Sequence, residues 1–242
     1  MKTRQPKKKI LFVIVEGPSD ESALSEVFKE LFKNYNVQFI QKHGDLTSES
    51  FSNSGNILKR VWDFTEKWIK TYHLKKKDIF AVVLVTDLDG CFVDEKVVLE
   101  DSSVQDVAYT EHSIVCPVRA SIIARNQRKK ANLIRLFKSK SIGGVCFSVI
   151  FFSRNLEHFL HGRIDNCTDY EKESLALTYY QEFQKDPEPK LQYFRKAAEL
   201  INNSEKEVSE FLEADNNSLK ANSNLFIEQE RLLALILPAK EK

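Results

Sequence analysis

The sequence predicts an α/β fold in which a parallel β-sheet is flanked by helices and followed by a helical C-terminal region. Short apolar runs rich in β-branched residues alternate with amphipathic stretches as far as about residue 162, a pattern typical of parallel sheets. From about residue 168 onward the stretches have a helical period and no strand signal appears. We therefore expect an α/β domain over residues 1–165 and a helical region over residues 166–242.

The first third of the chain contains the clearest strand signals. Each expected strand is a short, uninterrupted apolar run, as found where a parallel strand is buried on both faces, and each expected helix has apolar residues three or four positions apart. In chain order we expect a strand over 9–15, a helix capped by Ser19 or Asp20, a short strand over 37–40, a helix over 56–72 and a strand over 79–86.

Residues 91–118 fit no strong period, and we expect them to be an insertion with short strands. Beyond this insertion the alternation resumes, and the helical region is broken at Pro187 and Pro189 and again at 216–218. The expected elements are a helix over 119–139, a strand over 145–152, a short helix capped by Asn155, and helical stretches over 170–183, 190–214 and 225–237.

The composition excludes several classes of protein. No run of about 18 apolar residues is present, so we expect no membrane span. The four cysteines are widely spaced without a CxxC pair, which argues against a zinc ribbon or a disulfide scaffold and favours a reducing cytoplasm. The net charge of +1 is uneven, with 25 basic against 18 acidic residues in 1–154 and 11 against 17 in 155–242. Apart from a chance imbalance, this suggests a core that faces a polyanion and a tail that faces solvent or protein.

Acidic side chains directly follow the expected strands. Glu16 follows the first strand, Asp87 and Asp89 follow the clearest one, and Glu157 lies just beyond the last. Because the carboxyl ends of parallel strands form one edge, about 4.8 Å apart, these carboxylates can converge on one cation. In an extended segment Asp87 and Asp89 should project to the same side and share Mg²⁺, which prefers oxygen ligands. The simpler interpretation is that these residues only cap helices and form turns.

Two segments carry a resemblance to a known family. Val13-Ile14-Val15-Glu16-Gly17-Pro18-Ser19-Asp20 and Val83-Leu84-Val85-Thr86-Asp87-Leu88-Asp89-Gly90 together resemble the Toprim domain of topoisomerases, bacterial primases, small RNA-maturing nucleases and nucleases of the overcoming-lysogenization-defect (OLD) type. The motif of that domain is a Glu after the first strand and a later strand that ends in Asp-x-Asp. The resemblance covers roughly residues 9–162.

The resemblance implies a Rossmann-like sheet and phosphodiester chemistry that depends on Mg²⁺ or Mn²⁺. The segment 153–157 also looks like the later strand-to-helix corner of the nuclease members, where a further acid often joins the site. The implied metal ligands are Glu16, Asp87 and Asp89, with Glu157 as a fourth catalytic residue and Asp20 and Asn155 as further candidates.

Among the proteins that share this domain, the small nucleases of bacterial anti-phage defence fit the chain length best. The chain has neither the length nor the additional modules expected of a topoisomerase or a primase. Such nucleases often work beside an ATPase. Because this sequence contains no GxxxxGK[ST] loop of its own, the resemblance implies that an ATPase could be a separate partner protein. The acidic C-terminal helices are expected to mediate homo-oligomerisation or partner contact.

The expected helix over 119–139 is basic. From Arg119 to Lys140 there are eight bases and no acid, while apolar residues keep one side of the helix packed. Unopposed bases on such a helix are typical of contacts with the phosphates of nucleic acid, although an ordinary solvated face is the simpler interpretation. The candidate nucleic-acid-binding residues are Arg119, Arg125, Arg128, Lys129 and Lys130, of which Arg125, Arg128 and Lys129 are also candidates for stabilising charge on the reacting phosphate.

Two alternatives to a metal-dependent nuclease remain open from the sequence. The segment 85–90 also resembles the first motif of haloacid-dehalogenase-like phosphatases, which implies Asp87 as a nucleophile, but leaves Glu16 unexplained. The other alternative is a Toprim-like module that binds without catalysis. Turnover of p-nitrophenyl phosphate would favour the phosphatase over the nuclease. Absence of Mg²⁺ or Mn²⁺ binding in a metal titration would favour the module without catalysis.

Overall fold

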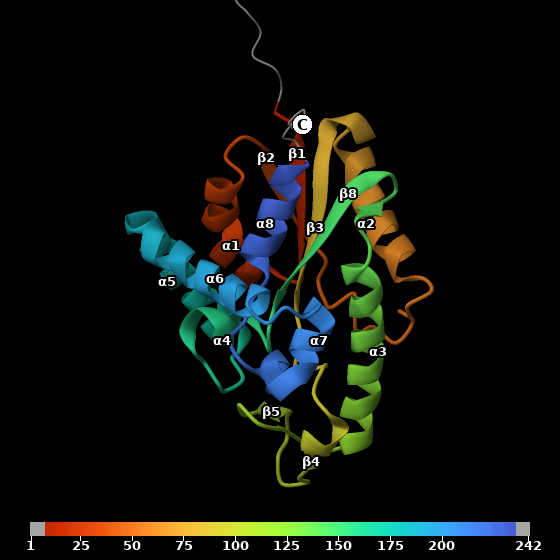
Figure 1. Cartoon of the computed structure of the whole chain (residues 1–242), viewed down its shortest axis with the longest axis vertical. Helices are drawn as coiled ribbons and strands as arrows, with labels where there is room; N and C mark the ends of the chain where they lie inside the picture. The colour runs from red at the N-terminus through yellow and green to blue at the C-terminus, as the bar shows by residue number, and fades with distance from the viewer. Residues whose placement is uncertain (1–7, 236–242) are drawn as a thin grey trace, which may run out of the picture.

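A five-stranded β-sheet forms the centre of the molecule in the computed structural model, which describes residues 8–235 (Figure 1). The strands lie in the order β2-β1-β3-β8-β7; the first four are parallel, and β7 pairs antiparallel with β8. The predicted α/β fold is therefore confirmed. The strands are β1 (Ile10–Val15), β2 (Asn36–Gln41), β3 (Ile79–Asp87), β7 (Ser141–Ile142) and β8 (Val145–Phe152).

The order of the strands creates a topological switch point between β1 and β3. From β1 the chain moves outward to β2, and then crosses back to β3 on the other side of β1. The loops that follow β1 and β3 consequently leave the sheet in opposite directions. Ligands of open parallel sheets bind in the crevice that forms at such a point, beyond the carboxyl ends of the strands.

Helices cover both faces of the sheet. They are α1 (Pro18–Leu31), α2 (Ile57–Thr71), α3 (Arg119–Phe137), α4 (Leu156–His161), α5 (Asp169–Lys185), α6 (Pro187–Asn202), α7 (Val208–Glu213) and α8 (Leu225–Ala234). Alternate residues of β1 are buried in two clusters, with Leu11 and Val13 on the side of α1, α5 and α8, and Phe12 and Ile14 on the side of α2 and α3. In Figure 1, α2 and α3 lie on one side of the strands and α1 and α8 on the other.

The C-terminal helices share the hydrophobic core of the sheet. Tyr179, Phe194 and Leu225, from α5, α6 and α8, are buried in the same cluster as apolar residues of β1 and β3. Ser223, just before α8, forms an antiparallel bridge with Phe152 at the end of β8. The helical region therefore completes one layer of the fold, and its removal would expose one face of the sheet.

The predicted insertion forms a second, small sheet. Its strands are β4 (Val98–Glu100), β5 (Ala108–Tyr109) and β6 (Ile114–Cys116), in the order β4-β6-β5, preceded by the 3-10 turn η2 (Glu95–Val97). Val98, Tyr109 and Ile114 belong to a separate apolar cluster that also includes Ile122 of α3. Figure 1 shows this insertion beyond one end of the main sheet, below α7 and beside the lower end of α3.

The structure also differs from the sequence prediction. The expected single helix over 190–214 is two helices, α6 and α7, because the polar segment 203–207 interrupts it and Glu205 adopts a φ of 54°. Strand β7 was missed because two residues are too few to show a period. The predicted end of the last helix, at residue 237, lies outside the described residues. Among residues 8–235, no helix combines the length and the apolar character needed to cross a bilayer.

Candidate active site

Glu16 and Asp87 lie side by side at the switch point. Strands β1 and β3 are paired in parallel register, with Ile14 opposite Leu84, so their carboxyl ends are adjacent. Glu16 is the first residue after β1, Asp87 is the last residue of β3, and the hydroxyl of Thr86 donates to Oε1 of Glu16 at 3.2 Å. The sheet topology has thus brought together two carboxylates that are 71 residues apart in the chain.

A third carboxylate enters from the start of α1. This helix begins at Pro18 with Gly17 as its N-cap, two or three residues earlier than the predicted caps Ser19 and Asp20, because proline is favoured at the first helical position. Asp20 occupies the third position and accepts a hydrogen bond from the Gly17 N–H at 3.0 Å. A cavity of ≈ 420 Å³ opens here, lined by Glu16, Gly17, Pro18, Ser19, Asp20, Gly44, Asp87, Asp169, Lys172 and Glu173.

The carboxylates in this cavity repel one another. Burial, followed by the charges of Asp45, Asp89 and Asp20, raises the pKa of Glu16 to about 8, although Lys129 opposes the shift. Burial and then the charges of Glu16, Asp20 and Glu157 raise the pKa of Asp87 well above its ordinary value. The pKa of Asp20 rises to about 6, chiefly through burial, against the hydrogen bond from Gly17. Burial is the main cause of all three pKa shifts, and repulsion from neighbouring carboxylates adds to it.

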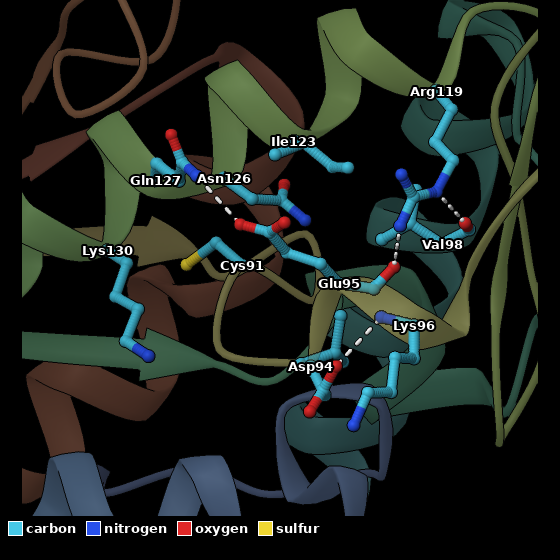
Figure 2. A pocket seen from close by; sticks show the side chains of 11 residues that line it. Cys91, Asp94, Glu95, Lys96, Val98, Arg119, Ile123, Asn126, Gln127 and Lys130 are labelled. Carbon is cyan, nitrogen blue, oxygen red and sulfur yellow. Dashed lines mark hydrogen bonds between the residues drawn. The ribbon is translucent and has the colours of Figure 1, made fainter.

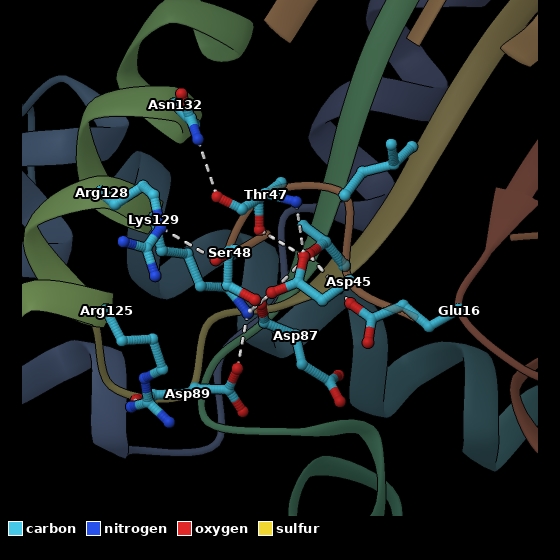
Figure 3. Close-up of polar contacts among 12 residues, drawn as sticks. Glu16, Asp45, Thr47, Ser48, Asp87, Asp89, Arg125, Arg128, Lys129 and Asn132 are labelled. Atoms are coloured by element: carbon cyan, nitrogen blue, oxygen red, sulfur yellow. Dashed lines mark hydrogen bonds and ion pairs between the residues drawn. The ribbon is translucent and has the colours of Figure 1, made fainter. Parts of the chain in front are cut away.

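Asp89 is held differently from Asp87. The extended geometry expected for this pair is wrong, because β3 ends at Asp87 and Asp89 adopts a left-handed backbone with a φ of 49°. The Asp89 N–H donates to the carbonyl of Arg154 at 2.8 Å, and its carboxylate lies 2.5 Å from the ammonium of Lys129. Asp87 and Asp89 face the same region in Figure 3, but Asp89 already has a cationic partner.

Lys129 is the centre of a buried ion-pair cluster. Its side chain is 0% exposed, and its ammonium also lies 2.8 Å from Oδ2 of Asp45, in the loop after β2. Figure 3 shows Lys129 reaching from α3 to a position between Asp45 and Asp89. This burial is incompatible with the expected contact between Lys129 and a nucleic acid. Because Lys129 occurs at helical spacing between the buried residues Ile122 and Leu133, the sequence did contain a signal for its inward position.

Two further bases of α3 also bind the protein itself. The guanidinium of Arg125 donates to the carbonyl of Asp89 at 3.0 Å and to the hydroxyl of Tyr109 at 3.2 Å. Arg128 donates to the carbonyl of Ser48 at 2.9 Å, and thereby fixes the loop after β2. These contacts attach α3 to the acidic loops and to the insertion. They give Arg125 and Arg128 a structural role that the sequence did not predict.

The remaining predicted bases, Arg119 and Lys130, line a second cavity of ≈ 480 Å³ between α3 and the insertion (Figure 2). The guanidinium of Arg119 donates to the carbonyls of Val98 and Glu95, at 2.8 and 2.7 Å. Lys130 forms a partly exposed ion pair with Glu213 at 3.1 Å. The exposed Lys96 lies on the opposite wall of the cavity. Lys96 and Lys130 are therefore the lysines of this region that solvent reaches.

Glu157 and Asn155 lie at the corner between β8 and α4, as predicted. Asn155 is the N-cap of α4, and its side-chain oxygen accepts the His158 N–H at 2.8 Å. Glu157 is buried in the first turn of the helix, with its Oε1 3.9 Å from the ammonium of Lys172. Its charge contributes to the raised pKa of Asp20 and of Asp87, but Glu157 lines a small neighbouring cavity with Ser19 and Lys172 and not the cavity of Glu16 and Asp87.

Sequence reasoning missed two residues of this region. Asp45 follows β2 as the other acids follow their strands, so its position at a strand end was an available signal. Lys172 lies in α5, outside the α/β half of the chain, and nothing in its sequence context distinguishes it from other surface lysines. Burial lowers the pKa of Lys172, but the charges of Glu157 and Asp87 more than compensate and raise it, so the ammonium stays charged beside the cavity.

The donor chemistry of the cavity fits a hard divalent cation. Within the described part of the chain, no three His, Cys, Asp or Glu side chains are arranged as a ready-made metal cage. Mg²⁺ does not require such a cage, because it is commonly held by one or two carboxylates and keeps several waters. Glu16 and Asp87 provide adjacent carboxylates on two strands. The charges of neighbouring carboxylates add to the burial that raises the pKa of each, and a bound cation would relieve that repulsion.

Comparison of the chain with protein-family models, with curated proteins and with solved structures found no match.

Proposed function

We propose that this protein is a metal-dependent nuclease that cleaves phosphodiester bonds of DNA or RNA with Mg²⁺ or Mn²⁺. The observation that carries the proposal is the pair Glu16 and Asp87, on adjacent parallel strands at the switch point, with Asp20 in the same cavity. Carboxylates that crowd together at the cost of raised pKa values are typical of sites that bind a cation or transfer protons. The Glu and Asp-x-Asp motif that resembles the Toprim domain supports the same reading.

The residues divide into those that would hold the metal and those that would act on the substrate. Glu16, Asp87 and Asp20 line the cavity and would hold one or two divalent ions, while Asp89 would join them once released from Lys129. A bound ion supplies Lewis-acid polarisation of the phosphodiester and lowers the pKa of water. The ammonium of Lys172 lies at the same cavity and would stabilise negative charge that develops on the phosphate.

We propose that the nucleic acid passes along the second cavity, between α3 and the insertion. Lys96 and Lys130 line it together with Asp94 and Glu95. Arg125, in the same helix as Lys130, donates to the carbonyl of Asp89 and links α3 to the acidic site. Lysines placed in this way would contact phosphates and orient the strand without reading its sequence. Through the resemblance to OLD-type nucleases, we further propose a cytoplasmic role in bacterial defence, with a partner ATPase or a second copy of this chain bound through the C-terminal helices.

The test is a cleavage assay on the full chain. Purified protein is incubated with plasmid, linear DNA and total RNA in Mg²⁺, in Mn²⁺ and in EDTA, beside Glu16→Ala and Asp87→Ala. Glu66→Ala is the matched control, because Glu66 is an ion-paired carboxylate on α2 away from the cavity. Cleavage that requires the metal, survives in the control and is lost in both site variants is expected. Activity retained in both site variants would refute the assignment.

The same preparations test the two alternatives. Turnover of p-nitrophenyl phosphate through an aspartyl-phosphate on Asp87, without cleavage of any nucleic acid, would replace the nuclease with a phosphatase. Absence of Mg²⁺ and Mn²⁺ binding, with retained affinity for nucleic acid, would leave a binding module without catalysis.

A further inference from the structure

The ion pairs of Lys129 link two acidic loops of unequal freedom. One partner, Asp45, is fixed on both sides: its Oδ1 accepts the N–H and the hydroxyl of Thr47, at 2.7 and 2.5 Å, while its Oδ2 faces Lys129. The carbonyl of Thr47 in turn accepts the side-chain amide of Asn132 in α3, at 2.8 Å. The Asp45 carboxylate is therefore held in place beside the ammonium by contacts that do not involve Lys129.

The other partner, Asp89, is fixed by its backbone, and Lys129 is the partner that the structure gives its side chain. Its N–H and its carbonyl are bonded to the Arg154 carbonyl and to the Arg125 guanidinium, at 2.8 and 3.0 Å. Its carboxylate, in contrast, has the Lys129 ammonium as its side-chain contact and is 30% exposed, compared with 14% for Asp45. Rotation of this one side chain would move the carboxylate away from Lys129 and toward Asp87, whose carboxylate lies in the same region in Figure 3.

The charges of the cluster permit that rotation. Lys129 with Asp45 and Asp89 has a net charge of −1, so departure of Asp89 leaves a neutral pair of Lys129 and Asp45. A buried ammonium that keeps one bonded carboxylate avoids the large cost of an unpaired buried charge. If Asp45 were neutral, the same departure would leave the fully buried Lys129 without a counter-ion.

We propose that Lys129 and Asp45 are positioning residues that control the delivery of Asp89 to a divalent cation. In the cation-free protein Lys129 retains Asp89, and when the cation binds, Asp89 turns to it while Asp45 neutralises Lys129. This inference rests on the proposed metal site and adds a step of control to it. It predicts that metal affinity depends on a residue, Asp45, that need not touch the metal.

The test is the binding of Mn²⁺ to the full chain, measured by the electron paramagnetic resonance signal of free Mn²⁺ and without any nucleic acid. Asp45→Asn is expected to weaken binding by at least about 10-fold, the lower end of the effect of residues that orient metal ligands. The double variant Lys129→Met with Asp45→Asn removes both charges, frees Asp89, and is expected to bind at least as tightly as the wild type. Glu66→Gln is the control, and thermal unfolding checks that each variant folds.

The outcomes separate this inference from the proposed function. Wild-type affinity in Asp45→Asn, or a double variant as weak as Asp45→Asn, would overturn the role of Lys129 and Asp45. If Asp87→Asn loses Mn²⁺ binding in the same series, the proposed metal site is supported even when the role of Lys129 and Asp45 is refuted. If Asp87→Asn also keeps wild-type affinity, both the metal site and its control by Lys129 and Asp45 are refuted. Should Asp45→Asn not fold, the double variant alone decides, since a 10-fold loss relative to the wild type contradicts the inference.

Discussion

The acidic strand ends and the basic helix α3 were both expected to be functional, but their side chains have different surroundings in the structure. Glu16 and Asp87 meet in one cavity, as their positions after parallel strands predicted. The bases of α3 are largely turned to the protein itself, with Lys129 fully buried and Arg125 and Arg128 bonded to loop carbonyls. A strand end has a fixed location in a parallel sheet, whereas the exposed face of a helix depends on what packs against it.

This difference gives α3 a new part in the site. Its bases supply the counter-charge and the hydrogen bonds that hold the acidic loops after β2 and β3 together. Under the proposed function, the carboxylates of the cavity would bind the metal, and the bases of α3 hold the loops that carry or flank them. Substitutions of the cavity carboxylates and of the α3 bases should therefore have different consequences for activity and for stability.

The largest expected effect is a separation of activity from stability at the strand ends. Glu16→Gln and Asp87→Asn should each lower metal-dependent cleavage by at least about 100-fold. Both should also raise the melting temperature of the metal-free protein at pH 8, by about 2–4 °C for each kcal/mol gained, because they remove carboxyl groups whose burial disfavours the charged form. Cleavage and thermal unfolding are measured on the same samples, with Glu66→Gln as control. Equal losses of activity and stability would contradict the prediction.

The second expected effect is a loss of stability when bases of α3 are removed, in contrast to the gain expected at the strand ends. Arg125→Ala and Arg128→Ala should each lower the free energy of unfolding by about 1.5–3 kcal/mol, the range for lost hydrogen bonds from a charged group. Lys130→Ala, which removes a partly exposed ion pair, should cost less than about 1 kcal/mol. Urea denaturation measures all three. A loss of nucleic-acid affinity in Arg125→Ala at unchanged stability would contradict this structural role and support the sequence-based hypothesis that Arg125 binds nucleic acid.

The pH dependence of stability isolates Glu16. Its pKa is about 8 in the folded protein against an ordinary value of 4.5, so between these values the folded chain binds more protons than the unfolded chain. The free energy of unfolding of the metal-free protein should therefore fall as the pH rises through this window. Glu16→Gln should reduce the slope, as measured by urea denaturation at successive pH values. A slope that is identical in the variant would show that Glu16 is not the group responsible.

The smallest effect is expected on the rim of the second cavity. Lys96→Ala and Lys130→Ala should each weaken binding of labelled DNA or RNA in EDTA, and each should reduce the dependence of log affinity on log salt by about 1. Lys70→Ala, on the outer side of α2, serves as the control. Unchanged salt dependence in both cavity variants would place the nucleic acid elsewhere on the protein.

The parts of the fold that the sequence predicted are those with a strong local period. Strands β1, β3 and β8 are buried apolar runs, and their parallel arrangement determines where Glu16 and Asp87 lie. The parts that escaped prediction depend on contacts between distant segments. Lys129 meets Asp45 across 84 residues (129 minus 45), and the left-handed backbone of Asp89 is fixed by the carbonyl of Arg154. No local pattern encodes such contacts, although the apolar spacing around Lys129 indicated its inward side.

The central claim is that carboxylates from separate strands hold one divalent cation. Anomalous diffraction from a crystal soaked in Mn²⁺ tests it most directly, because the position of the ion is observed and not inferred from activity. The account predicts a peak in contact with carboxylate oxygens of both Glu16 and Asp87. A crystal that shows Mn²⁺ bound elsewhere, with no peak between these two side chains, would contradict it.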